Sequence, residues 1–197
     1  MTQPTFVLLL GAPAVGKSTV ARLVAARTGF GLTHNHVAIE AALPLFSFDT
    51  KEFRDLVFKL RCDIFSAAAS SALPGMVGTF VWNHASARGD KMVEYWCAIF
   101  QRRRWRIVFV ELNASLRTRL ERNRSPGRDF QKASKSEPAR SEAILMANER
   151  DWIMSAPPGK MLTPADEFFS LTTDEMSPSA VADRIIDLAR LSQVGRY

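Results

Sequence analysis

One octapeptide near the N-terminus, Gly11-Ala12-Pro13-Ala14-Val15-Gly16-Lys17-Ser18, constrains the fold of this chain more than any other segment. It matches the pattern G-x-x-x-x-G-K-[S/T], in which a loop wraps a chain of phosphates with its backbone N–H groups pointing inward. Glycine at both ends permits unusual backbone angles and the close approach of a ligand. A strand should precede such a loop and a helix should follow it, because the helix N-terminus completes the anion site.

The residues on both sides of this loop have the required character. Residues Thr5–Leu10 (TFVLLL) form a continuous apolar run, which is typical of a strand buried on both faces. An amphipathic helix is expected over residues 17–28. The pattern predicts that the loop and Thr19 bind the phosphates of ATP, with Lys17 on the β- and γ-phosphates. It also predicts that the Ser18 hydroxyl is a ligand of Mg²⁺.

Strand and helix patterns alternate along the rest of the 197 residues, which predicts βαβ units and a parallel sheet. We expect one domain over residues 1–197, an α/β three-layer P-loop NTPase fold with a five-stranded parallel sheet. The expected strands are 5–10, 31–34, 76–82, 106–112 and 168–171. The expected helices are 17–28, 37–43, 50–73, 90–103, 114–123, 139–153 and 178–191. A polar, basic segment with Pro126, Gly127 and Pro138 predicts a mobile lid over about 123–140.

Composition is that of a soluble globular protein, with 47% apolar and 23% charged residues. No segment approaches the roughly 20 apolar residues of a membrane span, and the N-terminus lacks a signal peptide, so a cytoplasmic location is expected. Cys62 and Cys97 are predicted to be buried free thiols. The net charge of +6 would suit nucleic acid, but the arginines cluster at 102–106 and 117–128. Nucleic acid is therefore not the expected partner, and the oligomeric state is not indicated.

The phosphate loop and the second arginine cluster resemble the small P-loop kinases, a family that includes shikimate kinase, gluconate kinase, adenylate kinase and chloramphenicol phosphotransferases. The resemblance covers nearly the whole chain. In that family the helix after the fourth strand carries R-x-x-R and leads into a lid. The resemblance implies that Arg119 lies by the nucleotide and that Arg122 lies near the phosphates. Arg122 and Arg128 would stabilise the charge on the transferred phosphoryl group.

The segment that follows the last expected strand also resembles the family. Residues Leu171–Pro178 (LTTDEMSP) occupy the place of the family's adenine-binding loop. This resemblance implies a nucleotide contact by Asp174. An alternative interpretation is that Thr173 and Asp174 cap the final helix.

The acceptor side departs from the family pattern. Many members carry Asp or D-x-D after the second strand, whereas this chain has Thr33-His34-Asn35-His36, and its third strand leads to Trp82-Asn83-His84. Ligands bind at the carboxyl edge of a parallel sheet, so we predict that His36, Asn83 and His84 contact the acceptor. His36, the candidate catalytic residue, or His84 could serve as the general base, since the ordinary pKa of histidine lies near neutrality. A metal site built from His34 and His36 is the alternative.

A further acceptor candidate lies on the long expected helix. Phe53-Arg54 resembles a pair that binds an anionic acceptor in shikimate kinase-like members, and the alternative is that Arg54 is a surface arginine. The leading hypothesis is transfer of the γ-phosphate of ATP to a small molecule through an alcohol group. The alternatives are a nucleotide or nucleic-acid-end kinase and an ATP-binding module that transfers nothing. The chain contains no N-K-x-D motif, which argues against a GTPase.

Overall fold

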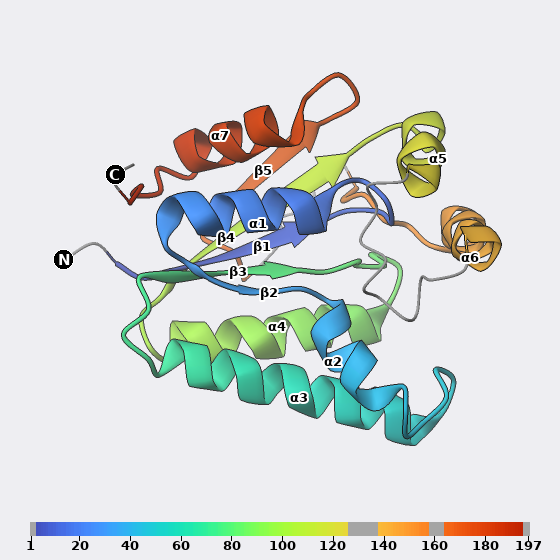
Figure 1. The fold of residues 1–197 in the computed structure, drawn as a ribbon. Helices are drawn as coiled ribbons and strands as arrows, with labels where there is room; N and C mark the ends of the chain where they lie inside the picture. The colour runs from blue at the N-terminus through green and yellow to red at the C-terminus, as the bar shows by residue number, and fades with distance from the viewer. Residues whose placement is uncertain (1–2, 126–137, 158–163, 195–197) are drawn as a thin grey trace.

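In the computed structural model, residues 3–125, 138–157 and 164–194 are described, and they form a three-layer α/β fold (Figure 1). Its five strands pair in the order β2-β3-β1-β4-β5, and every pair is parallel. The strands are β1 (Thr5–Leu10), β2 (Gly31–Thr33), β3 (Gly75–Thr79), β4 (Arg106–Asn113) and β5 (Glu167–Thr172). The predicted fold class is confirmed.

Helices cover both faces of the sheet and its carboxyl edge (Figure 1). Helices α1 and α7 pack together on one face, α3 and α4 cover the other face, and α2 packs on α3. Helices α5 and α6 lie beyond the carboxyl edge. Their bounds are α1 (Lys17–Thr28), α2 (His36–Ala42), α3 (Lys51–Ala69), α4 (Ala87–Gln101), α5 (Leu116–Arg124), α6 (Pro138–Asp151) and α7 (Pro178–Leu188).

The central strand β1 joins the two halves of the core. Phe6, Leu8 and Leu10 face α3 and α4, whereas Val7 and Leu9 face α1 and α7. Each of the five side chains is 0% or 1% exposed, as the continuous apolar run predicts. Because a sheet buried on both faces is held by packing and by its hydrogen-bond ladder, its carboxyl edge is a rigid platform for the loops that leave it.

Several element ends differ from the expectation. Strand β3 ends at Thr79 rather than at Trp82, and α4 begins at Ala87 because the Ser86 hydroxyl accepts a hydrogen bond from Gly89 N. Most of the predicted lid, including Arg128, lies outside the described residues, whereas residues 123–124 and 138–140 belong to helices α5 and α6.

Among the described residues, no helix is long and apolar enough to cross a membrane. Cys62 and Cys97 are both free thiols, and Cys97 is buried as predicted, but Cys62 is only partly buried.

Candidate nucleotide and acceptor site

The phosphate loop leaves β1 and curls back over the start of α1. Gly11, Ala14 and Gly16 have φ angles of +130°, +62° and +106°, and a β-carbon at Gly11 would lie 2.2 Å from the Leu112 carbonyl oxygen. Lys17 Nζ donates hydrogen bonds to the carbonyl oxygens of Gly11 (2.6 Å) and Ala12 (2.8 Å). The lysine ammonium therefore lies within the curve of the loop, beside the positive end of the α1 dipole.

A cavity of about 720 Å³, here called the phosphate cavity, extends from this loop along the carboxyl edge of the sheet. Three permanent cations line it, Lys17, Arg22 and Arg122, together with the imidazoles of His34 and His36. Within the described part of the chain, no carboxylate lines it. Such a cavity concentrates positive charge and attracts a polyphosphate.

Arg122 joins the phosphate loop to the turn after β5. Its Nη1 donates to the carbonyl oxygen of Val15 (3.1 Å) and to Thr173 Oγ1 (3.1 Å), and its Nη2 donates to the Thr173 carbonyl oxygen (2.6 Å). Met176 and Pro178 continue the same wall of the phosphate cavity. Arg122 therefore lies beside the phosphate loop and lines the phosphate cavity.

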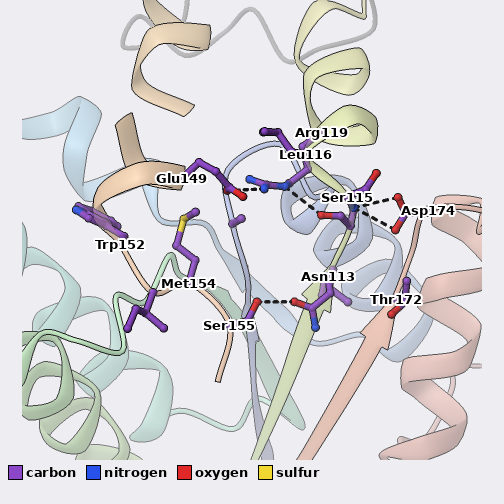
Figure 2. Close-up of a pocket in the computed structure, with 14 residues that line it drawn as sticks. Asn113, Ser115, Leu116, Arg119, Glu149, Trp152, Met154, Ser155, Thr172 and Asp174 are labelled. Atoms are coloured by element: carbon purple, nitrogen blue, oxygen red, sulfur yellow. Dashed lines mark hydrogen bonds and ion pairs between the residues drawn. The ribbon is translucent and has the colours of Figure 1, made fainter. Parts of the chain in front are cut away.

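The structure does not bring Arg119 and Asp174 to the phosphate cavity. Both line a second cavity, beside α5 and α6 (Figure 2). Arg119 donates from Nη2 to Glu149 Oε2 (2.5 Å) and from Nε to the Ala114 carbonyl oxygen (3.1 Å). Instead of lining the phosphate cavity, both side chains bind protein partners.

Asp174 holds the start of α5 and does not cap the final helix, where Ser177 accepts from Ala180 N instead. Its carboxylate accepts hydrogen bonds from Ser115 N (3.0 Å) and Thr118 Oγ1 (2.7 Å). These hydrogen bonds from Ser115 and Thr118 lower the pKa of Asp174 to about 2.

The depressed pKa of Asp174 predicts a pH-dependent contribution to stability. The ionised carboxylate stabilises the folded state above its unfolded pKa of about 3.9, and this contribution is lost as the pH falls through about 2. We expect Asp174→Asn to lower the melting temperature at pH 7 and the difference from the native chain to vanish by about pH 2. Thermal unfolding against pH measures this. The exposed neighbour Glu175 supplies the control, Glu175→Gln, and equal curves for both variants would contradict the assignment.

The turn between β2 and α2 forms the other end of the phosphate cavity. Asn35 N donates to Thr79 Oγ1 (3.0 Å), and Arg61 Nη2 donates to Asn35 Oδ1 (2.6 Å). The Arg61 guanidinium lies over the rings of Phe80 and Trp96, and burial lowers its pKa to about 10. It remains charged at neutral pH and fixes the turn, which presents His34 and His36 to the cavity.

Glu40 and Arg22 are two residues of this region to which sequence reasoning gave no role. His36 Nδ1 lies 3.8 Å from Glu40 Oε1, one helical turn along α2. Arg22 Nη2 donates to Ser18 Oγ (3.3 Å), again across one turn. Both pairs have i,i+4 spacing, which is the signal available from the sequence, although His36 lies one residue before the expected helix 37–43.

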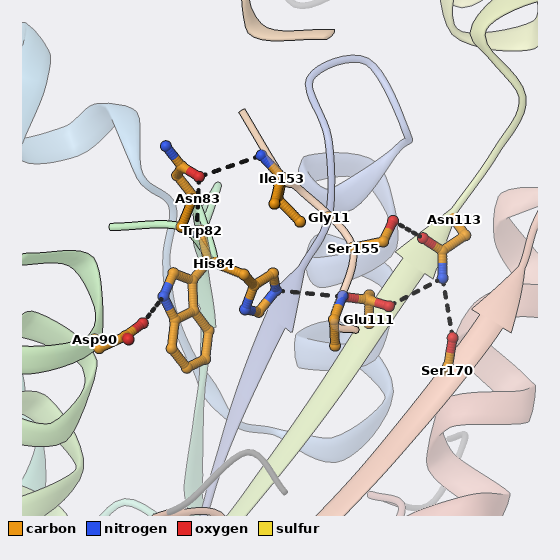
Figure 3. Close-up of polar contacts among 12 residues, drawn as sticks. Gly11, Trp82, Asn83, His84, Asp90, Glu111, Asn113, Ile153, Ser155 and Ser170 are labelled. Carbon is orange, nitrogen blue, oxygen red and sulfur yellow. Dashed lines mark hydrogen bonds and ion pairs between the residues drawn. The ribbon is translucent and has the colours of Figure 1, made fainter. Parts of the chain in front are cut away.

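Asn83 and His84 lie at the carboxyl edge, but they hold the segment after α6 (Figure 3). Asn83 Oδ1 accepts from Ile153 N (3.2 Å), and His84 N donates to the Ile153 carbonyl oxygen (2.7 Å). The His84 ring is buried against Trp82, and its Nε2 lies 3.7 Å from Glu111 Oε1. Neither residue lines the phosphate cavity with His36.

Arg54 also lies away from this cavity. It is exposed on the first turn of α3, where its Nη1 donates to the Asp49 carbonyl oxygen (2.6 Å). This placement matches the alternative interpretation, a surface arginine.

The residues around Ser18 fit a magnesium ion that is held mainly by a nucleotide. Mg²⁺ keeps several water ligands and commonly binds through substrate phosphates, so one protein hydroxyl is compatible with it. No group of three or more His, Cys, Asp or Glu side chains is arranged for a metal within the described ranges. Among the described residues there is therefore no third side chain of these types that would complete a metal site with His34 and His36.

No protein-family model and no curated protein sequence matches the chain. Its fold is similar to solved structures of small P-loop kinases. A sugar kinase from Janibacter sp. HTCC2649 has a TM-score of 0.61, with 14% identity over 96% of both chains. An APS kinase from Mycobacterium tuberculosis, in complex with AMPPNP and APS, has a TM-score of 0.59 and 16% identity, over 96% of this chain and 99% of that one.

A third similar structure is a shikimate kinase from Bacteroides thetaiotaomicron, with a TM-score of 0.56 and 17% identity over 95% of this chain and 99% of that one. The chain therefore has the fold of the small P-loop kinases, and the predicted resemblance is confirmed at the level of structure.

Proposed function

We propose that this protein is an ATP-dependent kinase that transfers the γ-phosphate to a hydroxyl group of a small molecule. One observation carries the proposal: a single cavity is bordered at one end by the phosphate loop and at the other by His34 and His36. A triphosphate on the loop and an acceptor beside the imidazoles would share this cavity. In-line transfer between them requires positioning and neutralisation of charge.

In the proposed reaction, the cations of the cavity and the Ser18 hydroxyl have the following roles. Lys17 exchanges the loop carbonyls for the β- and γ-phosphates, and Arg122 contacts the nucleotide beside Val15 and Thr173. The Ser18 hydroxyl would be a ligand of Mg²⁺. When bound, ATP with Mg²⁺ would supply the phosphoryl group that is transferred. Arg22 adds positive charge beside Ser18. Arg128, in the proposed lid, would add a further cation to the transition state.

His36 is the proposed general base. Its Nδ1 faces Glu40, so Nε2 would take the proton of the acceptor hydroxyl while the oxygen–phosphorus bond forms. The bond between the γ-phosphorus and the bridging oxygen breaks, and ADP leaves with that oxygen. Glu40 acts as a positioning residue, because a carboxylate beside one ring nitrogen fixes the orientation of the imidazole and stabilises its protonated form.

His36→Ala is expected to lower kcat by about 10²- to 10⁴-fold, the usual contribution of a general base. Glu40→Gln should cause a smaller loss and should move the pH profile of kcat, because the carboxylate stabilises the imidazolium. The affinity for ATP should change little in either variant. Steady-state kinetics against pH and calorimetric titration with AMPPNP measure these effects. His34→Ala removes the other imidazole that borders the cavity and is the comparison, and an equal loss of kcat in both variants would mean that the effect is not specific to His36. Full turnover in His36→Ala would exclude the base.

The proposal itself is tested by a phosphoryl-transfer screen. Purified protein with ATP and Mg²⁺ would be offered sugars, shikimate-like acids, nucleosides and antibiotics, with transfer followed as ADP formation. Lys17→Ala serves as the blank. We expect one acceptor class to give ADP in the native chain alone.

One observation favours a second candidate, an ATP-binding module that transfers nothing. The described lining of the phosphate cavity has no carboxylate to orient an acceptor. Tight AMPPNP binding without transfer to any acceptor would support this candidate. A nucleic-acid-end kinase would instead transfer phosphate to oligonucleotides, and their binding would weaken steeply with salt.

A further inference from the structure

A second cavity, of about 530 Å³, lies at the carboxyl ends of β4 and β5 (Figure 2). We call it the side cavity. Its walls come from α5, from α6 and from a segment over residues 152–156 that we call the strap. Ala12 is the phosphate-loop residue that borders it, and the described linings of the two cavities share no residue. The side cavity is large enough for a small molecule of drug-like size.

The wall formed by the strap is held firmly. The turn after β3 binds its start, as described above (Figure 3). Near its end, Ser155 Oγ donates to Asn113 Oδ1 (3.0 Å), and Ala156 N donates to Glu111 Oε1 (2.7 Å). These partners lie on β4, in the rigid sheet. The side cavity is therefore preformed, which lowers the entropy cost of binding.

Arg119 lines this cavity and carries a buried hydrogen-bond donor. Its side chain is only 5% exposed, and Nη2 and Nε are occupied by Glu149 and the Ala114 carbonyl. Its Nη1 is buried and has no hydrogen-bond partner within the described part of the chain. A buried donor without a partner costs about 1–3 kcal/mol, so a ligand that offers an acceptor atom here gains that contribution.

The charged side chains that line the side cavity sum to a negative charge, whereas those that line the phosphate cavity sum to a positive charge. Its described lining contains one cation, Arg119, and two carboxylates, Glu149 and Asp174. A phosphate or carboxylate group would be repelled by both, because like charges in a partly desolvated site disfavour each other. The ligand that fits is uncharged.

The remaining lining combines an aromatic surface with hydroxyl and amide groups. Trp152 is 41% exposed, Met154 is buried, and both side chains line the cavity from the strap. Polar side chains of Asn113, Ser155 and Thr172 line the opposite side. An aromatic ring beside several neutral hydrogen-bonding groups suits a ring molecule that carries hydroxyl groups.

We propose that the side cavity is a second ligand-binding site, which takes an uncharged, hydroxyl-bearing ring molecule. The ring lies against Trp152, and an oxygen or nitrogen of the ligand accepts the hydrogen bond from Arg119 Nη1. Nucleosides and free sugars are the two classes of molecule that have these features. The inference is independent of the proposed kinase activity.

The test is calorimetric titration of the full chain with adenosine, uridine, glucose and galactose, in the presence of saturating AMPPNP and Mg²⁺. We expect one of the two classes to bind and inorganic phosphate not to compete. Trp152→Ala should weaken that binding by about tenfold, the effect of losing one stacking contact, whereas Trp152→Phe should retain it. Trp152 is exposed, so this pair does not disturb the core.

Two further variants separate the side cavity from the phosphate cavity. Arg119→Gln should weaken binding of the same probe, whereas Lys17→Ala, titrated without nucleotide, should leave it unchanged. The proposal is overturned if none of the four probes binds, if binding is unchanged in Trp152→Ala, or if it is lost in Lys17→Ala. Failure of the phosphoryl-transfer screen would not affect this result, because the measurement is of binding.

Discussion

Lys17→Ala is expected to weaken ATP binding by about 100-fold and to reduce the rate of phosphoryl transfer by a further 10²- to 10³-fold or so. Lys17 places its ammonium within the curve of the phosphate loop, 2.6 Å and 2.8 Å from two loop carbonyl oxygens. In the proposed complex it moves to the β- and γ-phosphates, where the transferred charge accumulates. Titration with AMPPNP measures the first effect, and steady-state turnover with the identified acceptor measures the second.

The control for this variant is Arg54→Ala, which also removes one positive charge. Arg54 is exposed on α3 and lies outside the phosphate cavity, so its loss should leave ATP affinity unchanged. Equal losses in the two variants would mean that the affinity reflects net charge rather than the loop. Unchanged affinity and turnover in Lys17→Ala would exclude the phosphate loop as the nucleotide site.

The fold was predictable because its signals are local. The bounds of α1 agree with the expected 17–28, since Gly16 and Gly29, both left-handed, flank the helix. The boundaries that were wrong depend on tertiary contacts. The expected strand 76–82 follows an apolar run, but β3 ends at Thr79, and Trp82 packs against Phe109 and His84.

The candidate site likewise has one part that follows from local sequence and another that depends on tertiary contacts. The phosphate loop follows from eight consecutive residues, and the structure gives it the backbone angles that the motif requires. In contrast, Arg119 and Arg122 are one turn apart on α5 and have the same chemistry. Arg119 lines the side cavity, where it pairs with Glu149, a residue 30 positions away along the chain. Periodicity along a helix carries no information about such a partner.

The second large effect is expected from Gly11→Ala, which should lower the free energy of unfolding by about 4 kcal/mol. The added β-carbon would lie 2.2 Å from the Leu112 carbonyl oxygen. That oxygen belongs to β4, whose ladder with β1 pairs Leu10 with Glu111, so neither strand can move away without breaking sheet hydrogen bonds. For a chain of this length the loss corresponds to a fall in melting temperature of roughly 10 °C.

Gly16→Ala separates this steric clash from backbone strain. Gly16 also has a positive φ, +106°, but a β-carbon there would meet no atom within 4 Å. Its substitution should therefore cost only the strain of the backbone, about 1–3 kcal/mol. Chemical denaturation of both variants gives the two free energies. If Gly16→Ala is as destabilising as Gly11→Ala, the contact with Leu112 is not what requires glycine at the start of the loop. If Gly11→Ala costs clearly more, close packing of the loop against β4 is the requirement, and it acts even without nucleotide.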